Sequence, residues 1–203
     1  MYFSIFENYR WFDGSLGGLT INGPTNPADQ NRHSIGLAVS ANDGRTWAFV
    51  DKIIPESIND SDGNPVLGAW SPSAVVVNSN QVDVYFHDAL GTKQYVAQLL
   101  GGVGLISLER LNKSDTTYRA NLDVISHGDL YELTYNDQPF NIVRTFLSTP
   151  SNFGTLCSEN IIVPANPSQR WPTPHQIIDG NKVHLYFWQF ESGADIHHWV
   201  RNI

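Results

Sequence analysis

Apolar, aromatic and β-branched residues gather in short segments along this chain, and clusters of Gly, Asn, Asp and Pro separate them. Residues 2–6, 34–40 and 46–54 form the first three segments. This pattern is typical of β-strands joined by turns. No segment has the 3.6-residue apolar period of an amphipathic helix. We therefore predict an all-β fold, with a surface loop over the Gly-, Asn- and Pro-rich residues 13–33.

A longer pattern recurs along the chain. Residues 70–88 (WSPSAVVVNSNQVDVYFHD) resemble residues 171–189 (WPTPHQIIDGNKVHLYFWQ), and residues 121–137 follow the same pattern with lower identity. Each unit has an apolar strand, a turn and a second apolar-aromatic strand. The second strands begin near residues 82, 130 and 183, which are 48 and 53 residues apart. Such a period, with about four strands in each unit, predicts the blades of a β-propeller. The whole chain, 1–203, is then a single propeller domain.

The strand count leaves the closure of the ring open. About fourteen strands are expected, which make roughly three and a half blades. The first blade begins at its second strand, residues 2–6, and the last blade ends at its third strand, residues 194–200. A strand shared between the two ends could close the ring, or the chain could be part of a larger propeller. A homo-oligomer could also cover the open blade edges, which otherwise favour aggregation.

Residues 40–47 (SANDGRTW) predict a tight turn between the second and third segments. The Asn42 side chain can bind backbone amides two residues on, and Gly44 accepts the positive φ that such turns need. Trp47 can pack as an anchor where the chain returns. The spacing Ser-x-Asn-x-Gly-x-Thr-Trp resembles the Asp-box of sialidases, with Asn42 in place of the usual Asp.

The motif WSPSAVVV at residues 70–77 resembles the corresponding motif of five-bladed glycosidases of the arabinanase, xylosidase and invertase-like groups. The resemblance implies a propeller that acts on or binds a carbohydrate at its central channel. Those enzymes use three carboxylates, namely a base or nucleophile, a general acid and an Asp that tunes a pKa. This chain departs from that pattern, since Ser73 stands in the place of the tuning Asp. The residues where the acid Glu is expected hold Asp123 and Asp129 instead.

The repeat and the resemblance together select the candidate site residues. The candidate catalytic carboxylates are Asp88 and Asp123. The candidate substrate-binding residues lie at the starts of the innermost strands or at the end of a second strand: Glu7, Trp70, Ser73, Arg170, Trp171 and His175. Aromatic rings with neighbouring polar groups suit sugar recognition, because the ring takes the C–H face and the polar groups take hydroxyls.

Each candidate also has a structural interpretation. Trp70 and Trp171 can pack between blades, and His175 can be a hydrogen-bonded residue of an innermost strand. Asp88 can bind the backbone amides of a turn. The repeat places Asp88 at the same position as Glu7, Asn136 and Gln189.

Composition and charge exclude several partners. The formal net charge is −8, and no basic stripe is found, which argues against nucleic acid. No apolar run is long enough to cross a membrane, and no signal-peptide pattern is found, so the compartment stays open between secreted and other locations. The single cysteine, Cys157, excludes an internal disulfide and a cysteine-based metal site.

No cofactor is expected, and calcium is a weaker alternative. Asp60, Asp62 and Asn64 stand at alternate positions, as calcium ligands do, but Ser71 occupies the place of the Glu that an EF-hand needs. Turn formation is the preferred interpretation of these residues. His197 and His198 are adjacent, so on a strand they point to opposite faces and cannot share one ion.

The repeat, the resemblance and the candidate residues are compatible with three functions. The first is a carbohydrate-active, glycoside hydrolase-like propeller, whose catalytic turnover the sequence leaves undecided. The second is a non-catalytic binding module of the lectin or adhesin type. The third is a structural assembly domain. The fold does not separate them, because propellers carry many activities.

Overall fold

The computed structural model describes residues 1–6, 33–113, 115–127, 130–147, 158–165, 172–190 and 194–203. These residues form sixteen strands, and no helix is found among them. The expected loop at residues 13–33 falls outside this part of the chain except for its last residue, which begins a strand. The all-β prediction is confirmed.

Fourteen of the strands form four antiparallel sheets, which we call the first to fourth blades. The first blade contains β1 (Tyr2–Phe6), β2 (His33–Val39) and β3 (Ala48–Ile54). The second contains β6 (Trp70–Asn78), β7 (Gln81–His87), β8 (Gln94–Leu100) and β9 (Gly104–Leu111). The third contains β10 (Ala120–His127), β11 (Leu130–Asn136), β12 (Ile142–Leu147) and β13 (Asn160–Val163). The fourth contains β14 (His175–Asp179), β15 (Lys182–Phe190) and β16 (Ala194–Asn202).

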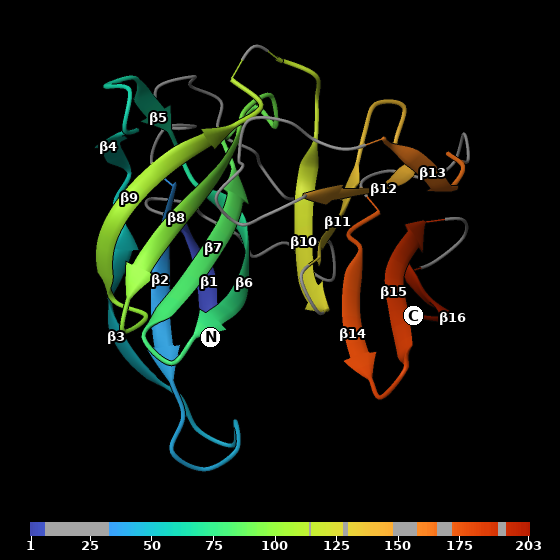
Figure 1. The fold of residues 1–203 in the computed structure, drawn as a ribbon, viewed down its shortest axis with the longest axis horizontal. Coiled ribbons are helices and arrows are strands. Elements are labelled where there is room, and N and C mark those ends of the chain that lie inside the picture. Colours follow the sequence, from blue (N-terminus) through green and yellow to red (C-terminus); the bar gives the residue numbers. More distant parts are fainter. Residues whose placement is uncertain (7–32, 114, 128–129, 148–157, 166–171, 191–193) are drawn as a thin grey trace, which may run out of the picture.

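The order of strands within each blade follows the chain, as a propeller requires. Figure 1 shows the second blade on the left, β10 of the third blade in the middle, and the fourth blade at the lower right with β13 of the third blade above it. In the part of the chain that the structure describes, the first and fourth blades have three strands each. A short hairpin of β4 (Ser57–Asn59) and β5 (Pro65–Leu67), which was not predicted from the sequence, precedes the second blade.

The strands of the second and third blades are apolar on both faces because each of these two blades packs between two others. Val84 and Phe86 of β7 belong to the core between the first and second blades. Tyr85, which lies between them in sequence, points to the opposite face and joins the core between the second and third blades. Leu185 and Phe187 of β15 pack against the third blade. The alternating side chains of β7 thus fill two cores, one on each face of the second blade.

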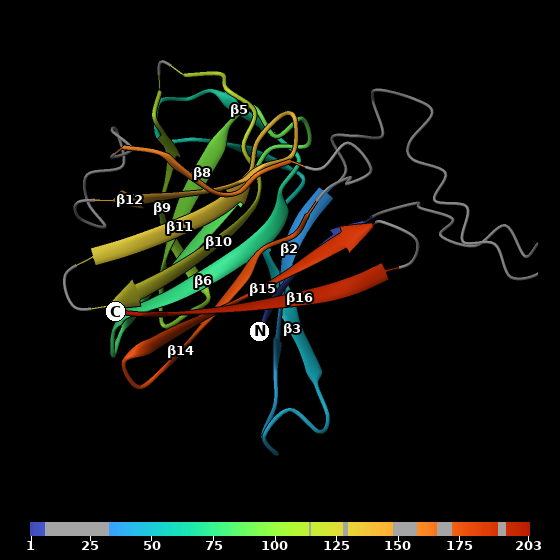
Figure 2. The same ribbon diagram turned by 90° about the vertical axis from the view of Figure 1, so that its right-hand side faces the viewer.

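The turn at residues 40–47 projects from the body of the molecule, as Figures 1 and 2 show. The predicted turn chemistry is present with one difference, because the Asn42 carboxamide oxygen accepts from the Thr46 amide at 2.8 Å rather than two residues on. The Ser40 hydroxyl accepts from the Gly44 amide at 2.8 Å, and Gly44 has the expected positive φ of 80°. The Trp47 indole donates to the Gly44 carbonyl and stays 48% exposed, so it anchors the turn itself and not the core.

Candidate functional site

The first strands of the second, third and fourth blades lie next to one another, with β6 beside β10 and β10 beside β14. Cross-strand pairing shows which of their residues are equivalent. Ser73 pairs with the fifth residue of β7, Asp123 with the fifth of β11 and His175 with the fifth of β15. Ser73, Asp123 and His175 therefore occupy the same position in three consecutive blades.

The structure brings these three predicted site residues into one hydrogen-bonded group. The Ser73 hydroxyl donates to Asp123 Oδ1 at 3.1 Å, and His175 Nδ1 lies 3.2 Å from the same oxygen. Asp123 Oδ2 accepts from the Gln176 backbone amide at 2.6 Å. We call Ser73, Asp123, His175 and Gln176 the Asp123 group. One buried carboxylate thus connects the inner strands of three blades.

A second chain of hydrogen bonds lies two residues earlier on the same strands. The Ser71 hydroxyl donates to the Asn121 carboxamide oxygen at 3.0 Å, and the Asn121 amide donates to the Asn136 oxygen at 2.7 Å. Ser71 and Asn121 have positive φ values of 51° and 53°, and the strand pairing shifts beside both. Non-glycine residues in this backbone region are uncommon and concentrate at functional sites. The same irregularity of strand pairing thus occurs at equivalent positions of β6 and β10, and it is a repeated feature of the inner strands.

His175 is the exposed member of the Asp123 group. Its side chain is 64% exposed, whereas that of Asp123 is 8% exposed. The hydrogen bond to Asp123 raises the pKa of His175, and partial burial opposes that effect. An imidazole oriented by a buried carboxylate can donate to a ligand oxygen when charged and can exchange a proton with it near neutral pH. The contact with Asp123 therefore fixes the orientation of the His175 ring.

Trp70 is half-buried and packs against two histidines. Its ring centroid is 4.3 Å from that of His33 and 6.4 Å from that of His87. Burial lowers the pKa of His87 to about 4, and His87 Nδ1 is 2.6 Å from the Asp88 carbonyl oxygen. These contacts agree with the packing interpretation of Trp70.

Asp88 lies in a turn, apart from the hydrogen bonds of the Asp123 group. Its carboxylate accepts from the backbone amides of Thr92 at 2.9 Å and Lys93 at 3.2 Å, and the residue is 2% exposed. Asp137 binds the Asn141 amide in the same way at 2.8 Å. The strand pairing makes Asp137 the equivalent of Asp88 and makes Asn136 the equivalent of His87. The repeat alignment from the sequence was therefore wrong by one residue at this position.

Three predicted site residues, Glu7, Arg170 and Trp171, lie outside the described residues. Their assignment to substrate binding stays a prediction.

The weak calcium signal is explained by turn formation. Asp60 Oδ1 accepts from the backbone amides of Asp62 at 3.1 Å and Asn64 at 2.8 Å, and Asp62 pairs with Lys113. Across the described ranges, no group of three or more His, Cys, Asp or Glu side chains is arranged to hold a metal ion. His198 stacks on Tyr186, and His197 stacks on Phe187. Tyr186 and Phe187 are adjacent on β15 and point to opposite faces, so the two histidines also lie on opposite faces, as predicted. Within the same residues, no helix is long and apolar enough to cross a bilayer.

Two further buried acids lie on second strands, and neither was predicted from the sequence. Burial raises the pKa of Asp83, which accepts a hydrogen bond from the Gln81 side chain at 2.8 Å. Glu132 holds the equivalent position in the next blade, pairs with Arg201 and accepts from the Gln176 side chain at 2.7 Å. In the sequence, each acid is a charged residue within an otherwise apolar strand. That position could have identified both as buried acids, because charged residues are rarely buried unless they are paired.

In sequence, the chain matches no known family model and no curated protein. Solved structures with a similar fold include the catalytic domain of a GH62 α-L-arabinofuranosidase from Coprinopsis cinerea, with 16% identity and a TM-score of 0.56 over 72% of this chain and 50% of that one. A GH43 endo-arabinanase from Bacillus licheniformis has 12% identity and a TM-score of 0.56 over 85% of this chain and 64% of that one. An exo-1,5-α-L-arabinanase from a bovine ruminal metagenomic library has 10% identity and a TM-score of 0.57 over 84% of this chain and 65% of that one.

The chain spans between half and just under two thirds of the length of these three structures. At such low sequence identity the likeness concerns the fold. The chain therefore has the β-propeller fold of glycoside hydrolases such as the GH62 and GH43 enzymes.

Proposed function

We propose that this propeller binds a glycan where its inner strands begin, with the Asp123 group in contact with the sugar. The observation that carries the proposal is the position of His175, an exposed imidazole held by a buried carboxylate at a point shared by three blades. Fixed donors and acceptors of this kind suit sugar hydroxyls, because the protein does not lose side-chain freedom when the ligand binds. The fold of glycoside hydrolases agrees with a carbohydrate ligand.

The roles within the group follow from its contacts. His175 is the residue that touches the sugar, and Asp123 orients its ring through the 3.2 Å contact to Nδ1. Ser73 and the Gln176 amide keep the Asp123 carboxylate in place. Glu7, Arg170 and Trp171 remain proposed partners of the same ligand, and Trp70 supports the site by packing.

Hydrolysis is the second candidate function. Glycoside hydrolysis needs two carboxyl groups about 5–10 Å apart, one of them protonated. Asp123 is the one acid in the group described above, and Asp88, the other proposed carboxylate, binds turn amides. We therefore favour binding over turnover. The likeness of the turn at residues 40–47 to a sialidase-type Asp-box also remains part of the proposal and concerns the fold, not the chemistry.

Binding should be tested first with a glycan array, followed by calorimetry on the ligands found. Because the similar structures include arabinanases and an arabinofuranosidase, arabinan oligosaccharides are the first probes. We expect His175→Ala to weaken sugar binding about tenfold or more, the effect of losing a charge-assisted hydrogen bond. His197→Ala is the matched control, since His197 stacks on Phe187 on the face of β15 that packs against the third blade.

Turnover should be tested with aryl α-L-arabinofuranosides and other aryl glycosides. Release of the aryl group that is lost in Asp123→Asn would favour hydrolysis over binding alone. Asp88→Asn separates the two interpretations of that residue, since a turn role lowers the melting temperature while a catalytic role lowers turnover at unchanged stability. If the protein neither binds nor cleaves any sugar but self-associates in sedimentation experiments, the assembly function replaces our proposal.

A further inference from the structure

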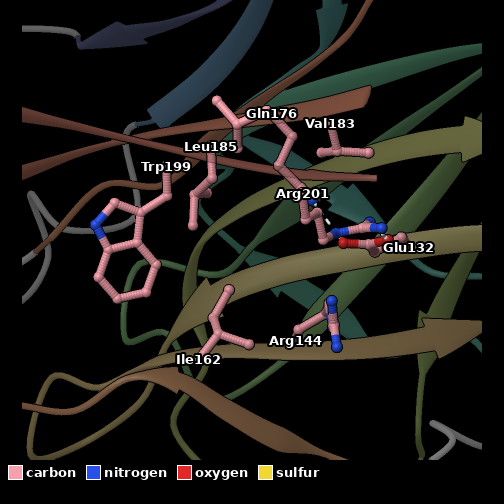
Figure 3. A pocket seen from close by; sticks show the side chains of 9 residues that line it. Glu132, Arg144, Ile162, Gln176, Val183, Leu185, Trp199 and Arg201 are labelled. Atoms are coloured by element: carbon pink, nitrogen blue, oxygen red, sulfur yellow. Dashed lines mark hydrogen bonds and ion pairs between the residues drawn. The ribbon is translucent and has the colours of Figure 1, made fainter. Parts of the chain in front are cut away.

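A cavity of about 260 Å³ lies between the third and fourth blades. Its walls come from β11, β12 and β13 on one side and from β14, β15 and β16 on the other. Figure 3 shows Trp199 at one end and Arg144, Arg201 and Glu132 toward the other. The cavity is distinct from the exposed imidazole of His175, and Gln176 is the residue that both regions share.

Most of the cavity surface is apolar. Ile162 forms one wall, and Val183, Leu185 and Trp199 form the opposite wall. The Trp199 side is near the surface, since this residue is 47% exposed. Next to the cavity, the same two blades pack closely through Ile142, Val163 and Phe187. The blades thus touch at one part of their interface and leave a mostly apolar pocket at another, and such a lining suits the apolar part of a ligand.

The charges that face the cavity do not balance. Arg201 pairs with Glu132, and that carboxylate also accepts from the Gln176 side chain. Arg144 adds a second guanidinium, which lies over the Phe146 ring at 5.7 Å from its centroid. Arg144 Nε is buried and has no hydrogen-bond partner among the described residues. A buried donor of a charged group is costly when it is unpaired, so an acceptor placed beside the half-buried Arg144 side chain would be stabilising.

We propose that this cavity binds a small amphipathic carboxylate. The apolar body of the ligand would lie against Leu185, Ile162 and Trp199. Its carboxylate would accept hydrogen bonds from the Arg144 guanidinium, whose planar fork of N–H groups matches a carboxylate. The combination of apolar walls and one correctly placed charged group is that of ordinary small-molecule sites. This proposal does not rest on the glycan site proposed above, although Gln176 contacts both regions.

The probes for the test are 4-phenylbutyrate and its neutral counterpart 4-phenylbutanol, measured by calorimetry on the full chain. We expect saturable binding of 4-phenylbutyrate, with an affinity at least tenfold higher than that of the alcohol. Arg144→Gln should remove this preference, and Arg144→Lys should keep part of it. Val183→Phe should fill the cavity and abolish the binding of both compounds.

Lys182→Gln is the matched control, because it removes a positive charge from an exposed position of β15 next to Val183. An equal loss in Lys182→Gln and Arg144→Gln would overturn the proposal, since the effect would then come from surface charge. Equal affinity for the acid and the alcohol, or no saturable binding of either, would also overturn it. Circular dichroism of each variant identifies any change that fails to fold, and in that case the comparison of the two probes on the unaltered chain decides.

Discussion

The Ser73 hydroxyl lies 3.1 Å from the Asp123 carboxylate, and the two residues hold equivalent positions in neighbouring blades, 50 residues apart in sequence. This contact therefore links the second blade to the third. Because Asp123 also accepts from the Gln176 amide of the following blade, one side chain connects three blades. The packing of these three blades and the position of the exposed His175 therefore depend on the same carboxylate.

Replacing Asp123 by Ala should destabilise the fold by about 3 kcal/mol, because the buried Gln176 amide loses its acceptor and the half-buried Ser73 hydroxyl loses one of its two. Asp123→Asn should cost less, since its carboxamide oxygen can still accept from Gln176. Urea denaturation monitored by fluorescence measures both values. The control is Asp179→Asn at an exposed strand end, which should change the stability by less than about 0.5 kcal/mol. Equal values for the Asp123→Ala and Asp179→Asn proteins would contradict the central role of Asp123.

The His175 imidazole should titrate above its ordinary pKa, because the hydrogen bond to Asp123 favours the charged ring. A raised pKa in the folded state gives stability that is present below the unfolded pKa of about 6.5 and is lost as the pH rises through the folded value. NMR of the His175 ring measures this directly. In Asp123→Asn the pKa should fall to the ordinary value or lower, since only partial burial then remains. An unchanged titration in that variant would show that the contact is absent in solution.

The His87 imidazole should have the opposite pH dependence. Burial lowers its folded pKa to about 4, so the unfolded state binds a proton first as the pH falls. Its contribution is present above about pH 6.5 and is lost between that value and about pH 4, by on the order of 3 kcal/mol. Urea denaturation at several pH values should show a smaller loss in acid for His87→Gln than for the unaltered protein. Parallel pH curves for the two proteins would refute the neutral, buried state of His87.

Gly91 should tolerate alanine less well than Gly101. Both have positive φ, +67° and +59°, so each alanine has a backbone cost of about 1 kcal/mol. At Gly91 the added Cβ would also lie 2.7 Å from Tyr118 Cε2, whereas at Gly101 no atom lies within 4 Å. Gly91→Ala should therefore lose at least about 1 kcal/mol more than Gly101→Ala, from overpacking against the Tyr118 ring. Thermal melts compare the two variants, and equal melting temperatures would show that the ring can move away.

Much of the fold could be predicted from the sequence because blades repeat. The second strands were placed near residues 82, 130 and 183, and the structure starts them at residues 81, 130 and 182. The β4–β5 hairpin could not be predicted, since its strands have only three residues each, too few to show an alternating pattern.

The site was predicted in part. The sequence pattern predicted Ser73, Asp123 and His175 as residues at the starts of inner strands. It did not predict their mutual contact, because that contact depends on how neighbouring blades pack, and the sequence of one strand does not determine this. Asn121 was not predicted as a site residue, because the register shift between Ala120 and Asp123 in the pairing of β10 with β11 cannot be read from residue composition. The cavity residue Arg144 was missed because an arginine in a strand gives no sign of which blade it faces.

Gln176 makes two separate sets of hydrogen bonds, one with its main chain and one with its side chain. Its main chain holds Asp123, and its side chain holds Glu132 and contacts the Thr134 hydroxyl in the wall between two blades. Any change that tilts the fourth blade on the third must therefore also move the carboxylate under His175. The orientation of the His175 imidazole and the packing of the fourth blade on the third therefore cannot be adjusted separately.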